Sequence, residues 1–475
     1  MPRPSRQTMV ALIVACALFM QNMDSTVIAT ALPTISAALG EDVLKLNLAI
    51  TCYLLSLAIF IPLSGWTADR YGARTVFRAA VAVFTLGSVL CGIAGSLWAL
   101  VLARIVQGAG GAMMVPVGRL VLLRTVPKAE LVSAMSYLAV PALLGPVMGP
   151  PLGGLIVTYS SWRWIFFVNV PFGLLGILLI NIFIENIRES APGPLDLRGF
   201  LLAGLGLAGT VYGLAALGRG GLSLGIALPL IGSGAALLVL YAFHARLTPS
   251  PVIDLSLMRI QTFRAALVGS AVFRIGIDGL PFLMPVLLQL GFGLSPLSSG
   301  LLTFATYAGA MTMKTTATPI IRAFGFRQIL MTNAVVCAAF MMSYGLFRPA
   351  TPHVLIFAAL LAGGFFRSLQ VTGTNTLVFA DVPAAQMSRA TSFVSMAQQL
   401  AISLGIGFSA AMLHIVHVLR GGEALAVADF TPIFVANGCI ALAAILSFVP
   451  LPGSAGAELS GHRVLAASPP QPPVR

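Results

Sequence analysis

Charged residues are the scarcest feature of this sequence. Only 9% of its 475 residues are Asp, Glu, Lys or Arg, whereas 58% are hydrophobic. Soluble domains carry about 25% charged residues, so a water-soluble fold of this length would need far more polar surface. The composition therefore indicates a protein that is solvated by a lipid bilayer.

Residues that bind metals or form disulfides are also few. The five cysteines lie in apolar runs without a CxxC pair, which favours small buried hydrophobes over a disulfide framework or a metal site. Only five histidines occur. We therefore expect no metal. A membrane-embedded enzyme or sensor is an alternative, but such a protein usually needs a His, Asp or Cys cluster at a membrane face.

Nucleotide-binding motifs are missing too. The sequence has no GxxxxGK[ST] phosphate loop, and its GxGxxG match at 204–209 lies inside an apolar run with no preceding strand. That context is typical of helix packing rather than of a dinucleotide site. We expect neither cofactor nor nucleotide, so any energy that this chain uses would come from an ion gradient.

Long apolar runs are what the sequence does have. A spanning helix needs about 20 mostly apolar residues, and the first run is too long for the apolar core of a signal peptide. The sequence predicts an all-α polytopic membrane protein with fourteen spans, at 9–32, 44–64, 77–96, 99–122, 131–157, 164–184, 199–217, 222–243, 263–289, 298–321, 329–346, 354–379, 390–416 and 430–449.

The net charge of +13 fits this topology better than it fits nucleic-acid binding, because most basic residues lie in short loops. With the N-terminus inside, the inner segments hold 17 Lys and Arg and the outer loops hold 5. This bias predicts that both termini are cytoplasmic. The glycine-rich pair at 199–217 and 222–243 is the weakest, and losing both runs would leave twelve spans with the same bias.

Two short patterns recur in the two halves of the chain. An aromatic-Gly-x-Arg pattern at 71–74 returns at 324–327, and Val-Pro-x-Ala at 126–129 returns at 382–385, at offsets of 253 and 256 residues. Duplicated units with a site between them are typical of secondary transporters. We expect a six-helix bundle at 1–184, two additional helices at 185–262, a second six-helix bundle at 263–449 and a disordered cytoplasmic tail at 450–475.

The loop after the second predicted span carries the most specific motif. Its residues 65–75, GWTADRYGART, closely resemble the GxLaDrxGrr loop of the major facilitator superfamily. The resemblance implies the fold of that family, two bundles related by a pseudo-two-fold axis, and a gating latch. The alternative is that these are only positive-inside charges. The implied latch residues are Gly65, Asp69, Arg70, Gly72 and Arg74.

Two further stretches resemble the fourteen-span drug:proton antiporters of that superfamily. Residues 23–33 are similar to their first-span motif and contain Asp24, a costly carboxylate at membrane depth that can carry a proton. Residues 104–111 are similar to their RxxqGxG motif, in which the arginine, here Arg104, takes part in proton coupling. The alternatives are a structural hydrogen bond for Asp24 and snorkelling to the outer interface for Arg104.

A glycine- and proline-rich stretch resembles the fifth-span motif of exporters. Glycines that recur every four residues form a smooth ridge for close packing, and the prolines are expected to bend the helix into a hinge. The alternative is a Gly/Pro-rich helix with no directional meaning. The stretch 161–171 also matches this branch. The implied hinge residues are Gly145, Pro146, Gly149, Pro150, Gly153 and Gly154.

The resemblance covers essentially the whole chain. It implies a proton-coupled exporter of small molecules that works by alternating access, as a monomer, in the bacterial inner membrane. Its partners would be a small-molecule substrate, protons and the lipid bilayer, with no nucleic acid. A uniporter or importer on the same fold is the alternative, and the exporter motif argues against it.

The charges inside the spans bear on the substrate. Setting aside Arg119 and the other basic residues near span ends, the predicted spans hold four bases and two acids. This surplus favours an anionic substrate, such as a carboxylate or a metal chelate of one. The alternative for Arg274 and Asp278, which are four residues apart, is that they pair with each other. We expect the cavity candidates Gln21, Gln107, Arg274, Asp278, Lys314, Arg367, Gln370, Asn375 and Gln399.

Overall fold

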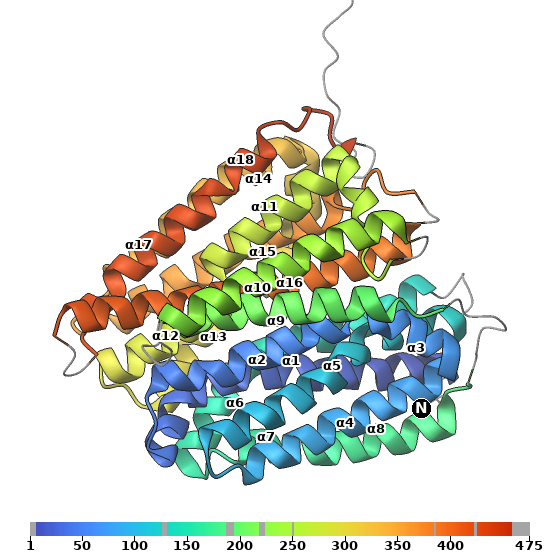
Figure 1. Ribbon diagram of the computed structural model, residues 1–475. Coiled ribbons are helices and arrows are strands. Elements are labelled where there is room, and N and C mark those ends of the chain that lie inside the picture. Colours follow the sequence, from blue (N-terminus) through green and yellow to red (C-terminus); the bar gives the residue numbers. More distant parts are fainter. Residues whose placement is uncertain are drawn as a thin grey trace, which may run out of the picture.

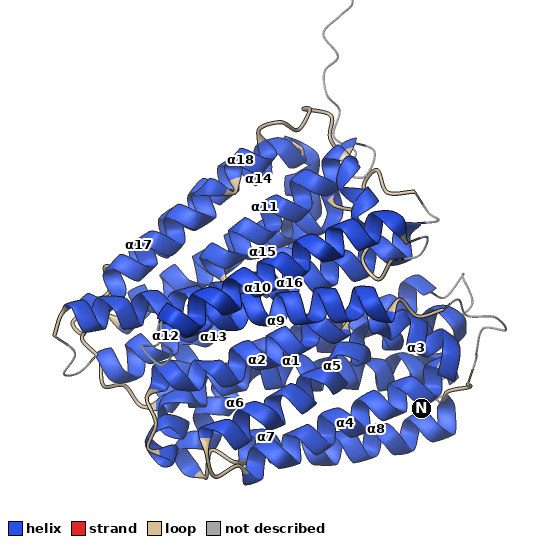
Figure 2. Ribbon diagram, viewed as in Figure 1, coloured by secondary structure: helices blue, strands red, loops and turns tan. Residues whose placement is uncertain are grey.

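The structure is a computed structural model that describes residues 6–125, 131–186, 194–217, 224–248, 251–383, 386–421 and 425–457. These residues are almost entirely helical and contain no strand (Figure 2). Among them, eleven helices are long and apolar enough to cross a membrane by length and composition. Each of the fourteen predicted spans overlaps one, two or three consecutive helices.

The N-terminal bundle provides the first six spans. Two of these spans are interrupted. The second span has a break at residues 61–62, between α2 and α3, and the sixth has a break at residue 168, between α7 and α8. Its helices are α1 (Arg6–Leu39), α2 (Val43–Phe60), α3 (Leu63–Tyr71), α4 (Ala73–Ile93), α5 (Leu97–Thr125), α6 (Leu131–Tyr159), α7 (Trp164–Phe167) and α8 (Asn169–Phe183).

The C-terminal bundle provides the last six spans. It lies beside the N-terminal bundle and diverges from it toward one end of the molecule (Figure 1). Its elements are η2 (Leu255–Arg259), α11 (Gln261–Ile277), α12 (Leu280–Val286), η3 (Leu287–Gly291), α13 (Pro296–Phe324), α14 (Phe326–Tyr344), α15 (His353–Leu377), α16 (Met387–Leu419), α17 (Val427–Ala443) and α18 (Ile445–Phe448).

Two further helices lie between the bundles. The helices α9 (Leu197–Leu217) and α10 (Leu224–Leu247) pack on each other, and α9 also contacts α2 and α16 (Figure 1). Gly206 and Gly209, which belong to the GxGxxG match, lie against the backbone around Gly234 of α10. The motif is therefore used for close helix packing, as its sequence context predicts.

The two bundles repeat one local geometry at their 71–74 and 324–327 turns. Gly72 and Gly325 both have positive φ, 91° and 73°, which favours glycine. Arg74 then donates to the Ile184 carbonyl at the end of span six (3.4 Å), and Arg327 donates to the Val449 carbonyl at the end of span fourteen (3.2 Å). The echo at 126–129 and 382–385 lies largely outside the described residues, as does the tail beyond residue 457.

The bundles meet at the end that the charge count assigns to the outside. There the Gln289 side chain donates to the Thr30 carbonyl (2.9 Å), and Gly154 of α6 lies against the backbone at Pro296. Nearer the middle, Asn47 of α2 donates to the Ile406 carbonyl of α16 (3.4 Å). The described structure is thus one in which α1, α2 and α6 are packed against α12, α13 and α16 at the predicted outer end.

Candidate functional site

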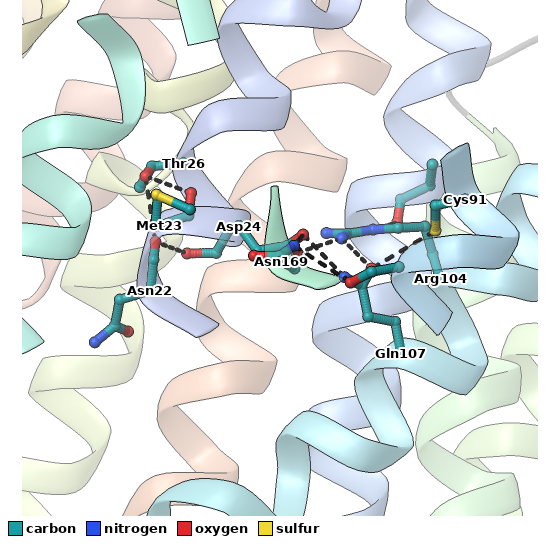
Figure 3. Close-up of polar contacts among 11 residues, drawn as sticks. Asn22, Met23, Asp24, Thr26, Cys91, Arg104, Gln107 and Asn169 are labelled. Carbon is teal, nitrogen blue, oxygen red and sulfur yellow. Dashed lines mark hydrogen bonds and ion pairs between the residues drawn. The ribbon is translucent and has the colours of Figure 1, made fainter. Parts of the chain in front are cut away.

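Asp24 lies at the centre of a polar network inside the N-terminal bundle (Figure 3). Its side chain extends from α1 toward α5, where Arg104 Nη1 donates to Asp24 Oδ2 at 2.5 Å. Asp24 is 2% exposed and Arg104 is fully buried. The structure therefore places Asp24 in a buried ion pair, and the complete burial of Arg104 rules out snorkelling to the interface for this arginine.

Neutral side chains complete the coordination of the Asp24 carboxylate. Gln107 Nε2 and Asn169 Nδ2 both donate to Asp24 Oδ1, at 2.9 and 3.0 Å. The same two nitrogens lie 2.7 and 3.2 Å from Ser88 Oγ. Gln107 Oε1 in turn accepts from Arg104 Nη1 at 2.6 Å. The network thus joins α1, α4, α5 and α8 around the Asp24 carboxylate. These bonds leave the carboxylate little freedom to move.

Arg104 also has an aromatic neighbour. Its guanidinium carbon lies 3.9 Å from the centre of the Tyr53 ring, at cation–π distance. Both Arg104 Nη2 and Tyr53 Oη are buried and have no hydrogen-bond partner among the described residues. The ion pair therefore keeps one donor unused, which leaves room for a rearrangement of the guanidinium when Asp24 changes its charge.

A second buried cluster occupies the C-terminal bundle. Arg274 and Asp278 do pair on α11, with Arg274 Nη1 3.1 Å from Asp278 Oδ2. Arg367 of α15 joins them, because its Nε and Nη2 both donate to Asp278 Oδ1, at 3.1 and 2.6 Å. Two arginines therefore share one carboxylate, and the cluster carries one net positive charge.

The other cavity candidates of this bundle are distributed differently. Gln370 is fully buried and bonds to Asn333 and to the Leu330 carbonyl of α14, so it serves helix packing. Lys314 is exposed and donates to Thr372 Oγ1 (2.6 Å). Asn375 accepts from Gln398 (2.7 Å) and lines a small cavity between α11, α15 and α16.

Two candidates have a buried side-chain oxygen without a partner. Gln399 Oε1 of α16 and Gln21 Oε1 of α1 are both buried, and neither makes a hydrogen bond within the described part of the chain. Gln21 does not join the network around Asp24. Such unpaired oxygens mark places where water or a ligand would be favourable.

Comparisons with known proteins fit this architecture. The sequence matches the family model of the Major Facilitator Superfamily over residues 14–406 and again over 266–469. The chain belongs to the major facilitator superfamily. Proteins named for multidrug resistance, MdtD of Salmonella typhi and of Salmonella typhimurium, are each 39% identical to it over 406 residues, covering 84% of this chain and 85% of theirs.

Solved structures show the same fold. A D-xylose–proton symporter superposes with a TM-score of 0.68 at 16% identity, covering 95% of this chain and 99% of that protein. The nucleoside transporter NupG, as its D323A mutant, superposes with a TM-score of 0.64 at 12% identity, covering 94% and 99%. The superfamily fold predicted from the sequence is thus confirmed, and the chain is a transporter rather than an enzyme.

The glycines of the fifth-span superfamily motif form a ridge against α1. Gly145 lies against the Phe19 carbonyl and Asn22, Gly149 against the Thr26 side chain, and Gly153 against the Val27 carbonyl. The helix α6 is continuous from Leu131 to Tyr159, so Pro146 and Pro150 do not interrupt it. The helix α6, which also contacts α13 of the other bundle, therefore packs closely against α1, which carries Asp24.

The superfamily loop at 65–75 is held by its own bundle. The side chain of Asn186 fills the space beside Gly72 and accepts from Thr75 N (3.3 Å), while Arg74 contacts the Ile184 carbonyl. Arg70 is exposed, and Gly65 has open space around it. These contacts tie α3 and α4 to the end of α8.

Three members of the Asp24 network were not predicted as site residues. Asn169 lies within the 161–171 stretch that matches the exporter branch, which was the available signal. Ser88 and Tyr53 have no such signal, because a serine and a tyrosine in apolar spans are ordinary. Only the approach of α2, α4 and α8 to α5 reveals their place.

Proposed function

We propose that this chain is a proton-coupled exporter of small molecules that works by alternating access. The observation that supports it most is the pair of Asp24 and Arg104, buried together with three neutral side chains. Asp24 is the only acidic residue within the six predicted spans of the N-terminal bundle. An ionisable residue inside a membrane bundle is expensive and therefore typical of a functional site.

Protonation would change this pair in a defined way. A neutral Asp24 gives Arg104 no counter-charge, so the guanidinium is left buried and unpaired, which costs several kcal/mol in general. The protonated form is then favoured only where Arg104 finds new partners or water. Two charge states of Asp24 thus favour two arrangements of α1 and α5, which is what coupling a proton to alternating access requires.

The contact between α1 and α6 offers a route from the proton to the gate. Gly149 and Gly153 of α6 pack against residues 26 and 27, directly after Asp24 on α1. Gly154, the residue after Gly153, faces the other bundle instead and lies against Pro296 of α13. A shift of α1 is therefore transmitted to the surface where the bundles meet.

The substrate is proposed to be a small anionic molecule. The C-terminal bundle holds Arg274 and Arg367 around a single acid, and Lys314 adds a further positive charge on α13. A cavity for cations would need surplus carboxylate instead. The related MdtD proteins are named for multidrug resistance, which supports efflux as the direction. A carboxylate or a metal chelate of a carboxylate fits this charge.

We further propose that the protein acts as a monomer in the bacterial inner membrane with both termini in the cytoplasm. The bias of 17 inner against 5 outer basic residues supports this orientation. Six spans precede and six follow the α9–α10 pair, so each bundle is complete within one chain.

Everted membrane vesicles test the proposal. Respiration acidifies their lumen, and an antiporter then releases lumenal protons as it moves substrate inward. Adding a transported anion should dequench a lumenal pH dye in vesicles that contain the protein, and should not do so in vesicles without it. Transport of the same anion with no proton movement would indicate a uniporter and contradict the proposal.

A further inference from the structure

The charge balance of the C-terminal cluster differs from that of the N-terminal pair. Asp24 faces one arginine, so that site is neutral, whereas Asp278 is shared by Arg274 and Arg367. Asp278 is 2% exposed. A net charge held inside a membrane bundle is costly, so the C-terminal site is short of one negative charge.

The structure indicates where that missing charge can arrive. The side chain of Arg367 is 21% exposed, against 9% for Arg274 and 2% for Asp278, so Arg367 is the accessible member. Tyr307 of α13 lines a small cavity between the bundles together with Thr26 and Thr30. Of the three charged side chains, Arg367 is therefore the one most open to an incoming molecule.

Arg274 has a donor that could bind Asp278 more fully. Its Nε is buried and has no hydrogen-bond partner among the described residues. Arg274 lies one helical turn before Asp278 on the same helix, so Asp278 can form a fuller pair with it by a change of side-chain rotamer alone. The cluster thus contains an unused donor for Asp278 if Arg367 is taken by another anion.

We infer that Asp278 is a built-in competitor of the substrate. Without substrate, Asp278 accepts two hydrogen bonds from Arg367. An incoming anion replaces Asp278 as the partner of Arg367, and the Asp278 carboxylate then pairs with Arg274. With a monoanion bound, two arginines face two negative charges and the site is neutral. When the anion leaves, Asp278 returns to Arg367, which hinders rebinding and favours release. This inference rests on the proposed anionic substrate.

Two other roles for Asp278 predict the opposite result. If Asp278 were only a structural counter-ion, its loss would loosen the site and weaken anion binding. If it were a second proton carrier, its loss would impair coupling without tightening binding. Competition alone predicts that removing the carboxylate tightens the binding of anions, because a tethered rival disappears.

A charge-matched pair of variants separates competition from net charge. The double variant Asp278→Asn, Arg274→Gln keeps the site at one positive charge, as in the wild type, and removes both the competitor and the arginine that would be left unpaired. The single variant Asp278→Asn raises the charge to two, and Arg367→Gln removes the docking arginine. All are compared as full-length protein in detergent, with monodispersity and thermal unfolding as checks of folding.

Equilibrium dialysis with radiolabelled benzoate and succinate is the measurement, at constant ionic strength because salt screens charges. We expect the double variant to bind at least about fivefold more tightly than the wild type, the low end of typical coupling between sites, and Arg367→Gln to bind at least about fivefold more weakly. Tetraphenylphosphonium, a cation, should not follow this order.

Equal or weaker binding of both anions by the folded double variant would overturn the inference. So would the absence of binding to any variant, because a site freed of its rival must then take the anion. The measurement needs no proton gradient, so a failure of proton coupling leaves this order of affinities unaffected. Conversely, if the variants do not show the expected order of anion affinities, the vesicle test of proton coupling can still succeed or fail on its own.

Discussion

Asp24 and Asp278 stand 254 residues apart, and each accepts hydrogen bonds from an arginine on the fourth span of its own bundle. Asp24 pairs with Arg104 of α5, and Asp278 pairs with Arg367 of α15. The repeat thus places two acid–arginine pairs in related positions. Because Arg274 adds a second positive charge beside Asp278 only, the two pairs differ in net charge. This difference supports our proposals of a proton site at Asp24 and an anion site near Asp278.

Arg104 is predicted to be needed for coupling. Arg104→Gln leaves Asp24 buried without its counter-charge, a change that costs about 3–5 kcal/mol for buried pairs, and proton-driven efflux should fall to background in everted vesicles. Arg104→Lys keeps the charge but lacks the planar fork, so intermediate activity is expected. Arg163→Gln, which alters an arginine bound to carbonyls at the end of α4, is the control and should retain efflux.

The glycine ridge is predicted to tolerate no added methyl group at Gly149. A Cβ there would overlap the Thr26 side chain, so Gly149→Ala should destabilise the protein by about 1–3 kcal/mol and slow efflux. Gly232 of α10 has no heavy atom within 4 Å of such a Cβ. Gly232→Ala should be neutral or slightly stabilising in thermal unfolding, and equal effects of the two variants would refute the role of the ridge.

Gly72 is predicted to matter for more than its backbone angle. Gly72 and Gly421 have φ of 91° and 102°, so alanine costs about 1–2 kcal/mol of strain at either position. Only at Gly72 would the Cβ also overlap Asn186. Gly72→Ala should therefore lower the unfolding temperature and the efflux rate more than Gly421→Ala. The same loss from both variants would indicate strain alone.

The loop before α11 gives a prediction about pH. Burial raises the pKa of Asp254, but hydrogen bonds from Ser256 and Arg389 outweigh it and hold the pKa below its ordinary value. A lowered folded pKa means that the stabilisation is present above about pH 4 and is lost as the pH falls through the folded pKa. Asp254→Ala should cost about 1 kcal/mol, as for other helix caps, at pH 7, and progressively less as the pH is lowered below about 4, as measured by thermal unfolding. A pH-independent cost would contradict this.

The sequence was most informative about elements whose signal is local. Apolar runs predicted stretches that all overlap helices of the structure, because membrane burial demands a continuous stretch of about 20 residues. The i, i+4 spacing of Arg274 and Asp278 likewise indicated their pairing. The arrival of Arg367 at the same carboxylate was not predictable in this way, because it depends on how α15 approaches α11.

The Asp24 site shows the same limit. Asp24, Arg104 and Gln107 were singled out because each belongs to a motif, but the motifs do not show that the Asp24 side chain lies in the interior of the N-terminal bundle. Gln370 was expected beside Arg367 as a ligand group, yet it bonds to α14. Which way a polar side chain points is decided by its neighbours on other helices, and spacing within one helix does not contain that information.

The most direct test of the account measures Asp24→Asn in proteoliposomes by two assays on one preparation. Exchange of a labelled anion against the unlabelled anion needs no net proton movement and should persist, whereas accumulation driven by a pH gradient should disappear. Asp42→Asn, which alters the N-terminal cap of α2, should retain both activities. Gradient-driven accumulation by folded Asp24→Asn at the wild-type rate would contradict the central claim that Asp24 carries the coupled proton.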